Sequence, residues 1–244
     1  MTDVRAQLAP KGRLRAAINY NNPLLARRDA ANGTLSGLAV DLAQELAARV
    51  EVSLTLIPYD SAGKISSSAL EDVWDVAFLA IDPLRAQQIA YTAAYLELEG
   101  TYLVPIDSPL QRVEEVDREG AQISVTAGSA YDLYLSRALK HARLVRVNDT
   151  PRSVVLMQEQ KLDAVAAVRT ALVAAARRAP GLRVMGGHFM TIPQAAGVPQ
   201  GRPLAIRYLR SFMEEMKASG FVAAALQRHG LGPEDAVVTA AAPL

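Results

Sequence analysis

Short apolar runs alternate with segments of helical periodicity along most of this chain. Residues 52–58 and 75–81 have the composition of strands, and residues 40–50 place apolar side chains at the spacing of one helix face. The same succession of strand and helix recurs at 163–168 and 170–178. Because parallel strands need crossover connections, which are usually helices, this alternation predicts an α/β fold with mostly parallel sheets.

Composition limits the classes to which such a chain can belong. Half of its 244 residues are hydrophobic and the formal net charge is +1, which argues against a disordered chain and gives no support to nucleic-acid binding. There are no cysteines, and the three histidines (His141, His188 and His229) lie far apart in the sequence. We therefore expect no disulfide and no metal centre, and nothing calls for a cofactor.

Two features bear on membranes and export. The longest stretch without Asp, Glu, Lys or Arg runs from Val184 to Gly201 and holds four glycines and two prolines, so it cannot form an uninterrupted spanning helix. The first residues mix charges with short apolar pieces and lack the apolar core of a secretory signal. The sequence leaves open whether the protein is cytoplasmic or a mature exported chain that begins with a new Met.

Asp82 and Pro83 follow the apolar run 75–81 and are residue types preferred at a helix N-cap and first turn, so we expect a helix to begin here. Two other segments, 97–101 and 186–201, have the character of connectors between two lobes. If the chain crosses at both, its first and last parts share one lobe and its middle forms the other.

Several short motifs follow one another along the chain in a fixed order. They are Leu14-Arg15 with Pro23, Gly37 to Leu42, Asp75-Val76-Ala77 with Arg85, Ile89 to Tyr95, Ile123 to Ser129, Asp163-Ala164-Val165, and Gly220-Phe221. Each motif is weak alone. Their order and spacing, over about residues 12–232, resemble the family 3 bacterial extracellular solute-binding proteins, which are periplasmic amino-acid-binding proteins of ABC importers.

The resemblance implies a two-lobed fold of the type II periplasmic-binding-protein kind, with two hinge crossovers and closure on a small solute. It implies lobe 1 from residues 1–98 and 193–244, and lobe 2 from residues 99–192. The implied function is that of a receptor subunit of an ABC-type importer, for a small carboxylate-bearing solute that is amino-acid-like or an organic acid. The implied partner is the membrane permease if the protein is exported, the implied location is the periplasm, and we expect a monomer.

Arg85 is the leading candidate for ligand binding. It follows a buried strand, near the carboxyl end of a sheet, where α/β crevices bind ligands, and a guanidinium matches a carboxylate bidentately. In the resembling family, an arginine at this position holds the ligand's α-carboxylate. The alternative is an ordinary surface arginine on the first turn of a helix. Ala80, at the end of the same strand, belongs to the same expected site.

A second candidate segment precedes a helix predicted at 131–139. N–H groups at such a position can point at an anion with help from the helix dipole. The resemblance implies that Ser129 and Ala130 donate hydrogen bonds to the ligand's carboxylate. Ser129 is also an ordinary helix cap. Tyr131 either lines the ligand site or faces outward.

Two departures from the family pattern affect the expected ligand. Val168 stands where family members carry the aspartate that binds the ligand's α-ammonium, and no acidic residue occurs from Ala164 to Pro180. Arg169 then brings a positive charge, or is simply a solvated residue at a helix start. Asp82 offers a substitute carboxylate, although helix capping is its simpler role. We therefore expect zwitterionic amino acids to bind poorly.

The aromatic residues of the family's ligand site are also fewer here. Asn22 and Ser61 lie where many members have stacking aromatics, and Tyr20 compensates in part. A polar pocket suits a small anion better than a large apolar side chain. The complete set of expected ligand-binding residues is Asn19, Tyr20, Asn22, Ser61, Ala80, Asp82, Arg85, Ser129, Ala130, Tyr131 and Arg169, and none is expected to be catalytic.

We expect a binding protein and not an enzyme. Dehydratases related to these receptors use a carboxylic general acid, and the stretch after Asp163 supplies none. No G-x-S-x-G elbow accompanies His188, the histidine nearest a connector. Two alternatives stay open: a dehydratase-like enzyme on the same fold, and a cytoplasmic ligand-sensing module, although no helix-turn-helix segment precedes the first strand.

Overall fold

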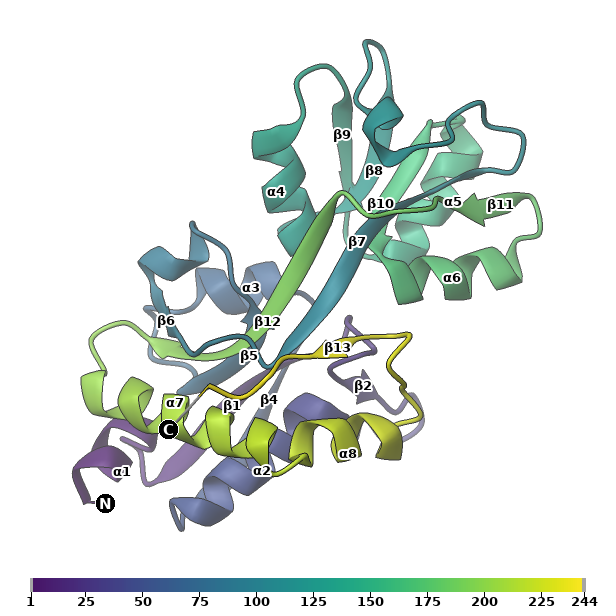
Figure 1. Ribbon diagram of the computed structural model, residues 1–244. Coiled ribbons are helices and arrows are strands. Elements are labelled where there is room, and N and C mark those ends of the chain that lie inside the picture. The colour runs from purple at the N-terminus through teal and green to yellow at the C-terminus, as the bar shows by residue number, and fades with distance from the viewer. Residues whose placement is uncertain (1, 243–244) are drawn as a thin grey trace. The chain divides into compact units, whose positions relative to one another are not determined.

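The computed structural model describes residues 2–242, and the chain divides into two units. Unit 1 combines the N-terminal segment up to Glu97 with the segment from Pro193 onward, and unit 2 runs from Leu98 to Ile192. The chain passes between the units within two strands, β7 (Leu96–Pro105) and β12 (Met190–Pro199), which Figure 1 shows as long arrows. Unit 2 is therefore an insertion into unit 1.

Unit 1 is built on a mixed sheet. Parallel strands β4, β1 and β5 are neighbours in that order, and β12 joins β5 antiparallel. Strand β6 pairs with β12, and β13 pairs with the start of β7. The remaining elements of this unit are α1 (Thr2–Leu8), β1 (Arg13–Asn19), β2 (Arg27–Arg28), β3 (Leu35–Ser36), α2 (Leu38–Arg49), β4 (Ser53–Tyr59), α3 (Ala62–Ser67), β5 (Val76–Ala80), the 3₁₀ turn η1 (Arg85–Gln87), β6 (Ile89–Tyr91), α7 (Pro203–Ala218), α8 (Phe221–Arg228) and β13 (Val237–Val238).

The strands of unit 2 follow one another in the order β7, β10, β8 and β9. Strands β10, β8 and β9 are parallel, while β7 runs antiparallel to β10 and also pairs with β11. The elements are η2 (Val113–Val116), β8 (Gln122–Thr126), α4 (Ala130–Ala138), β9 (Arg143–Val147), α5 (Thr150–Gln160), β10 (Ala164–Val168), α6 (Arg169–Arg178) and β11 (Leu182–Val184).

The apolar runs that predicted buried strands are confirmed. Strand β5 has the sequence VAFLA and is buried at every position, and β10 is buried at four of its five positions. Such continuous apolar strands are typical of sheets covered on both faces. The alternation of strands and helices thus produces the predicted α/β fold.

The expected helix at Asp82-Pro83 is wrong. Only the short 3₁₀ turn η1 forms, and the chain enters β6 at Ile89. The Oδ1 atom of Asp82 accepts the N–H of Leu84 at 2.8 Å, so the aspartate closes a local turn. A side chain that bonds to nearby backbone offers the chain an alternative to a helix, and this one is used here.

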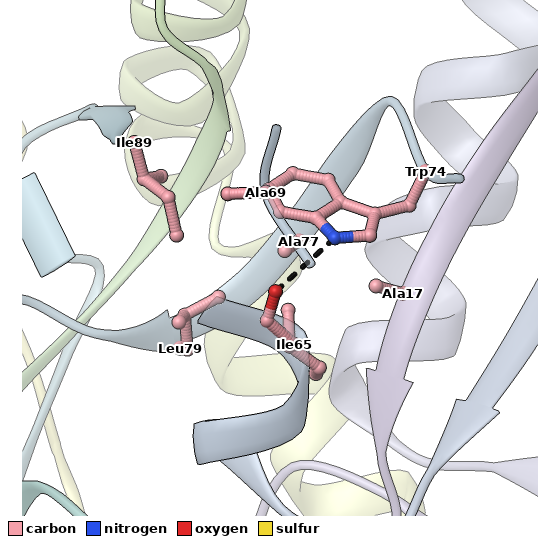
Figure 2. Packing of buried hydrophobic residues seen from close by; sticks show 7 residues of the cluster. All are labelled: Ala17, Ile65, Ala69, Trp74, Ala77, Leu79 and Ile89. Carbon is pink, nitrogen blue, oxygen red and sulfur yellow. Dashed lines mark hydrogen bonds between the residues drawn. The ribbon is translucent and has the colours of Figure 1, made fainter. Parts of the chain in front are cut away.

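The single tryptophan, Trp74, lies in a buried hydrophobic cluster of unit 1. Figure 2 shows Trp74 packed with Ile65 from α3 and with small residues of the sheet, and the other members of the cluster are Ala17, Ala69, Ala77, Leu79 and Ile89. The indole N–H donates to the carbonyl oxygen of Ile65 at 3.2 Å and lies 3.1 Å from the hydroxyl of Ser68. The polar edge of this large side chain is therefore satisfied inside the core.

Within residues 2–242, no helix combines the length and the apolar character that crossing a bilayer requires. The same part of the chain contains no cluster of three or more His, Asp or Glu side chains able to hold a metal ion.

Candidate functional site

The carboxyl ends of three neighbouring parallel strands frame the candidate site in unit 1. In the register of β1 and β4, Asn19 lies opposite Tyr59, and the next residue, Tyr20, donates its N–H to the Tyr59 carbonyl oxygen at 3.1 Å. On the other side of β1 lies β5, which ends at Ala80. The loops that follow these strands carry most of the expected ligand-binding residues of this unit, as parallel topology requires.

Arg85 lies in η1, directly after β5, and is buried with 4% of its surface exposed. Its Nη1 donates to the carbonyl oxygen of Ala80 at 3.1 Å. The hydroxyl of Tyr91, from β6, donates to the same oxygen at 3.4 Å. Ala80 thus positions the guanidinium through its backbone, and Tyr91 shares that acceptor.

The electrostatic surroundings of Arg85 are mixed. Burial lowers the pKa of Arg85, while the negative charge of Asp82 raises it. Burial also raises the pKa of the Tyr91 hydroxyl, which keeps that group neutral. Because arginine remains protonated at physiological pH, the loop after β5 holds a buried cation. A buried cation near a strand end is suited to bind an anionic ligand group.

Asp82 is 3% exposed and lies in the same loop as Arg85. Its carboxylate accepts the Leu84 N–H, and its carbonyl oxygen accepts the N–H of Ala86 at 2.9 Å. Both contacts shape the loop. The capping role that the sequence suggested for Asp82 is thus present as a turn, although no helix follows.

Three other expected residues of unit 1 make local contacts. The side-chain oxygen of Asn19 accepts the Asn21 N–H at 3.1 Å, and that of Asn22 accepts the Leu24 N–H at 3.3 Å. Ser61 caps α3, accepting the Lys64 N–H at 3.2 Å. All three hold the loops after β1 and β4 in shape.

In unit 2, Ser129 caps α4 by accepting the Asp132 N–H at 3.1 Å. Ala130 is buried, and so is Tyr131, whose hydroxyl lies 3.4 Å from Thr150 Oγ1. The outward orientation considered for Tyr131 is therefore wrong. Its ring packs inside unit 2.

The start of α4 already holds a carboxylate. Asp132 is 4% exposed, and its Oδ2 accepts the N–H of Gly128 at 2.8 Å. Arg146 from β9 pairs with the same carboxylate at 3.0 Å. This built-in anion complements the helix dipole and forms part of the environment of any second anion at this helix end.

Arg169 begins α6 and is tied to two other segments of unit 2. Its guanidinium pairs with Glu99 of β7 and donates to the carbonyl oxygens of Met185 and Gly187. His188 adds a second contact to Glu99, with Nδ1 at 3.4 Å from Oε1. The positive charge expected at Arg169 is thus present but compensated by Glu99.

The structure brings Asn19, Tyr20, Ser61, Ala80, Asp82 and Arg85 to neighbouring strand ends of unit 1. Sequence reasoning did not identify Tyr91, although its hydroxyl shares the Ala80 carbonyl with Arg85. It also missed Glu99, the partner of Arg169. Tyr91 belongs to the Ile89-to-Tyr95 motif, so the sequence contained a signal for it. Glu99 belongs to none of the motifs, and the sequence contained no signal for its pairing with Arg169.

Solved structures of similar shape cover almost the whole chain. A solute receptor for L-cysteine from Neisseria gonorrhoeae matches with a TM-score of 0.82 and 18% identity, over 97% of this chain and 99% of the receptor. A mutant of ArgBP from T. maritima matches with a TM-score of 0.79 and 21% identity, over 93% of this chain and 99% of that one. These likenesses show the type II periplasmic-binding-protein fold.

A third structure of the same fold is the ancestral amino acid-binding protein AncCDT-1, described as a precursor of cyclohexadienyl dehydratase. It matches with a TM-score of 0.76 and 17% identity, over 91% of this chain and 96% of the ancestral protein. A comparison with curated proteins found no match.

The sequence profile of one family matches residues 14–232, which is most of the chain. That match agrees with the order of motifs from Leu14 to Phe221 and with the fold of both units. This protein belongs to the bacterial extracellular solute-binding proteins, family 3.

Proposed function

We propose that this protein is the receptor subunit of an ABC-type importer and binds a small carboxylate-bearing solute without transforming it. The observation that carries the proposal is the buried guanidinium of Arg85, held against the carbonyl oxygen of Ala80 at the end of β5. A charge-assisted, bidentate contact with a carboxylate is the interaction to which such a group is best suited.

Relatives of the same fold support an amino-acid-like or organic-acid ligand. Their descriptions name arginine and L-cysteine as ligands, and both are small molecules with a carboxylate. In this chain, Val168 stands at the end of β10 in place of an acidic residue. We therefore favour acids without an α-ammonium group.

The proposal includes closure of the two units on the solute, with β7 and β12 as hinges, Arg85 as the main contact of unit 1, and the start of α4, with Ser129 and Ala130, as the contact of unit 2. The receptor acts as a monomer and delivers its solute to a membrane permease. Small-angle X-ray scattering tests the closure. An unchanged profile at saturating ligand would contradict it.

The binding test is a titration with a panel of small acids, followed by calorimetry and by Trp74 fluorescence. Arg85→Ala is the test variant, and Arg207→Ala, on the exposed side of α7, is the matched control. Loss of a charge-assisted contact in a desolvated site should weaken binding by about 2–5 kcal/mol, or about 30-fold or more. Equal affinity of the two variants would remove Arg85 from the site.

A second measurement separates binding from catalysis. After prolonged incubation with the protein, the bound solute should be recovered chemically unchanged by mass spectrometry. Conversion of the solute would instead support the dehydratase-like alternative.

A further inference from the structure

Only one asparagine of this chain is followed by glycine, in the pair Asn32-Gly33. The pair lies in the connection between β2 and β3, which form a small antiparallel hairpin, and Asn32 is exposed. Gly33 has a φ of +75°, a left-handed conformation that glycine adopts without strain. Because glycine has no side chain to shield its backbone nitrogen, this nitrogen is open to reaction with the neighbouring side-chain amide.

The side-chain amide of Asn32 is folded back along the chain. Its Oδ1 accepts the N–H of Thr34 at 2.8 Å, which closes an Asx turn around Gly33. The turn keeps the amide carbon of Asn32 beside the peptide that contains the Gly33 nitrogen. The Thr34 N–H is also placed to stabilise negative charge on Oδ1, as the donor of an oxyanion hole does.

Two hydrogen bonds to Asp29 restrain the same turn. The Gly33 N–H donates to the carbonyl oxygen of Asp29 at 2.9 Å, and the Asn32 N–H donates to its Oδ1 at 3.2 Å. While the first of these bonds is made, the Gly33 nitrogen keeps its proton and cannot act as a nucleophile. The Asp29 contacts must therefore break before the nitrogen reacts, whereas the Thr34 contact assists the reaction.

The hairpin that makes these contacts is small and poorly covered. Its strands, β2 and β3, have two residues each, and every residue from 27 to 36 is exposed or half-buried. A hairpin of two short strands has little stability of its own. Segments with few buried contacts open locally at a small cost in free energy, while the rest of the protein stays folded.

We propose that Asn32-Gly33 is a site of spontaneous covalent modification in the folded protein, reached through local opening of the β2–β3 hairpin. The Gly33 nitrogen loses its proton to hydroxide and forms a bond to Cγ of Asn32. The bond from Cγ to the side-chain nitrogen breaks, and this nitrogen takes a proton from water and leaves as ammonia. Water then opens the cyclic imide to aspartate or isoaspartate at position 32, and no oxidant or reductant is consumed. The inference does not depend on the proposed function.

The modification adds a carboxylate close to an arginine. Asn32 and Arg28 line the same hollow, with a volume of about 700 Å³, and Nη2 of Arg28 lies 3.5 Å from the place of a Cβ on Gly33. In the unmodified hairpin, the guanidinium carbon of Arg28 lies 5.6 Å from the centre of the Tyr20 ring, in the range of a cation–π contact. The new carboxylate therefore competes with Tyr20 for the guanidinium. Isoaspartate also lengthens the backbone of the turn by a carbon atom.

The test follows the wild-type protein during incubation at mildly alkaline pH. Asn32 is the only asparagine in its tryptic peptide, residues 29–49, so mass spectrometry of that peptide measures conversion of this amide to a carboxylate. An isoaspartate methyltransferase labels the isoaspartate product. Asn148, which is exposed and precedes Asp149, is the internal control. We expect conversion at Asn32 to be at least about tenfold faster than at Asn148.

Asp75→Asn separates local opening from global unfolding. The buried Asp75 carboxylate pairs with Arg15 and Arg202, so this variant should raise the population of the unfolded chain by about 100-fold or more. We expect the same rate of conversion at Asn32 in the variant and in the wild type, because opening of the hairpin breaks none of these contacts. If the variant does not fold, urea at concentrations below the unfolding transition of the wild type should likewise leave the rate nearly unchanged.

Three results overturn the inference. If residues 29–49 stay unmodified in the folded protein while a synthetic peptide of the same sequence is converted, the hairpin protects the site. If conversion accelerates in Asp75→Asn, or in dilute urea, in step with global unfolding, the modification belongs to the unfolded chain. Asn32→Gln would have to close a larger ring and should abolish the mass gain of the peptide, so a gain that persists in this variant arises elsewhere.

Discussion

Asp75 provides a sharp test of what holds unit 1 together. Its carboxylate is fully buried and accepts four hydrogen bonds from two arginines that are distant in sequence. Arg15 donates from Nε and Nη2, each at 2.8 Å, and from its backbone N–H at 3.0 Å. Arg202, just before α7, donates from Nη1 at 2.8 Å. The carboxylate thus links β1, β5 and the last third of the chain.

The perturbation is Asp75→Asn, which keeps the shape of the side chain and removes its charge. An amide retains one acceptor oxygen, so at least two charge-assisted bonds are lost, at about 1.5–3 kcal/mol each. Breaking a buried ion pair by neutralising one partner costs about 3–5 kcal/mol, in agreement with that sum. We expect the free energy of unfolding to fall by about 3–5 kcal/mol.

Urea denaturation followed by tryptophan fluorescence is the assay. Trp74 is the only tryptophan, is buried in unit 1 and precedes Asp75 directly, so its signal reports this unit even if unit 2 unfolds separately. Asp60→Asn removes a partly exposed partner of Lys64 and should cost less than about 1 kcal/mol. An equally small loss for Asp75→Asn would refute the reasoning.

Three further predictions concern backbone strain, acid stability and ligand class. Gly37→Ala should lower the free energy of unfolding by more than about 1 kcal/mol, because φ is +130° and the new Cβ would lie 2.5 Å from the carbonyl oxygen of Leu25. Thermal melts measure the loss, and Gly181→Ala is the control, because its new Cβ would have nothing within 4 Å. Equal losses of stability in the two variants would contradict this prediction. The hydrogen bond with Arg15 lowers the pKa of Asp72 from its ordinary value of 3.8 to about 2. The ionised Asp72 side chain therefore contributes its full stabilisation of the folded state above pH 3.8 and loses it as the pH falls towards about 2. The difference in unfolding free energy between wild type and Asp72→Asn should narrow over that interval, and a constant difference would argue against the assignment. In a thermal-shift panel, hydroxy acids and dicarboxylates should stabilise the protein more than matched amino acids do; the reverse order would sink this expectation and make Asp82→Asn the next variant to test.

The strands that could be predicted are those with a strong local signal. Val76 to Ala80 and Ala164 to Val168 are apolar throughout, and a short run of this kind between turn residues has few structures open to it other than a buried strand. The helix that was wrongly predicted to begin at Asp82-Pro83 also has a local explanation. Asp and Pro suit both a helix start and a tight turn, and only the return of the chain to β6 decides between them.

The candidate site was less accessible to sequence reasoning, because the partners of its charged groups are distant in the chain. Arg169 was expected either to add a positive charge to the site or to be a solvated residue at a helix start, and neither expectation included Glu99, which pairs with it from 70 positions away. Arg28 stands in an ordinary hairpin, and only the folded structure sets its guanidinium over Tyr20. Family resemblance indicated where a ligand is held, whereas tertiary pairing decides which charges are left to hold it.

The insertion of unit 2 into unit 1 sets an order of events during synthesis. Strand β5 acquires its neighbour β12 only when residues Gln194 to Gly197 have been made, because these pair with Ala77 to Ala80. At about 5–20 residues per second, the ribosome needs roughly 5–20 s to make the residues between them. During that time the nascent chain exposes an apolar, unpaired strand edge while unit 2 is free to fold first. A translation pause or a truncation before β12 therefore leaves an aggregation-prone strand edge on β5 exposed. The yield of folded protein should depend on the supply of chaperones between the synthesis of β5 and that of β12.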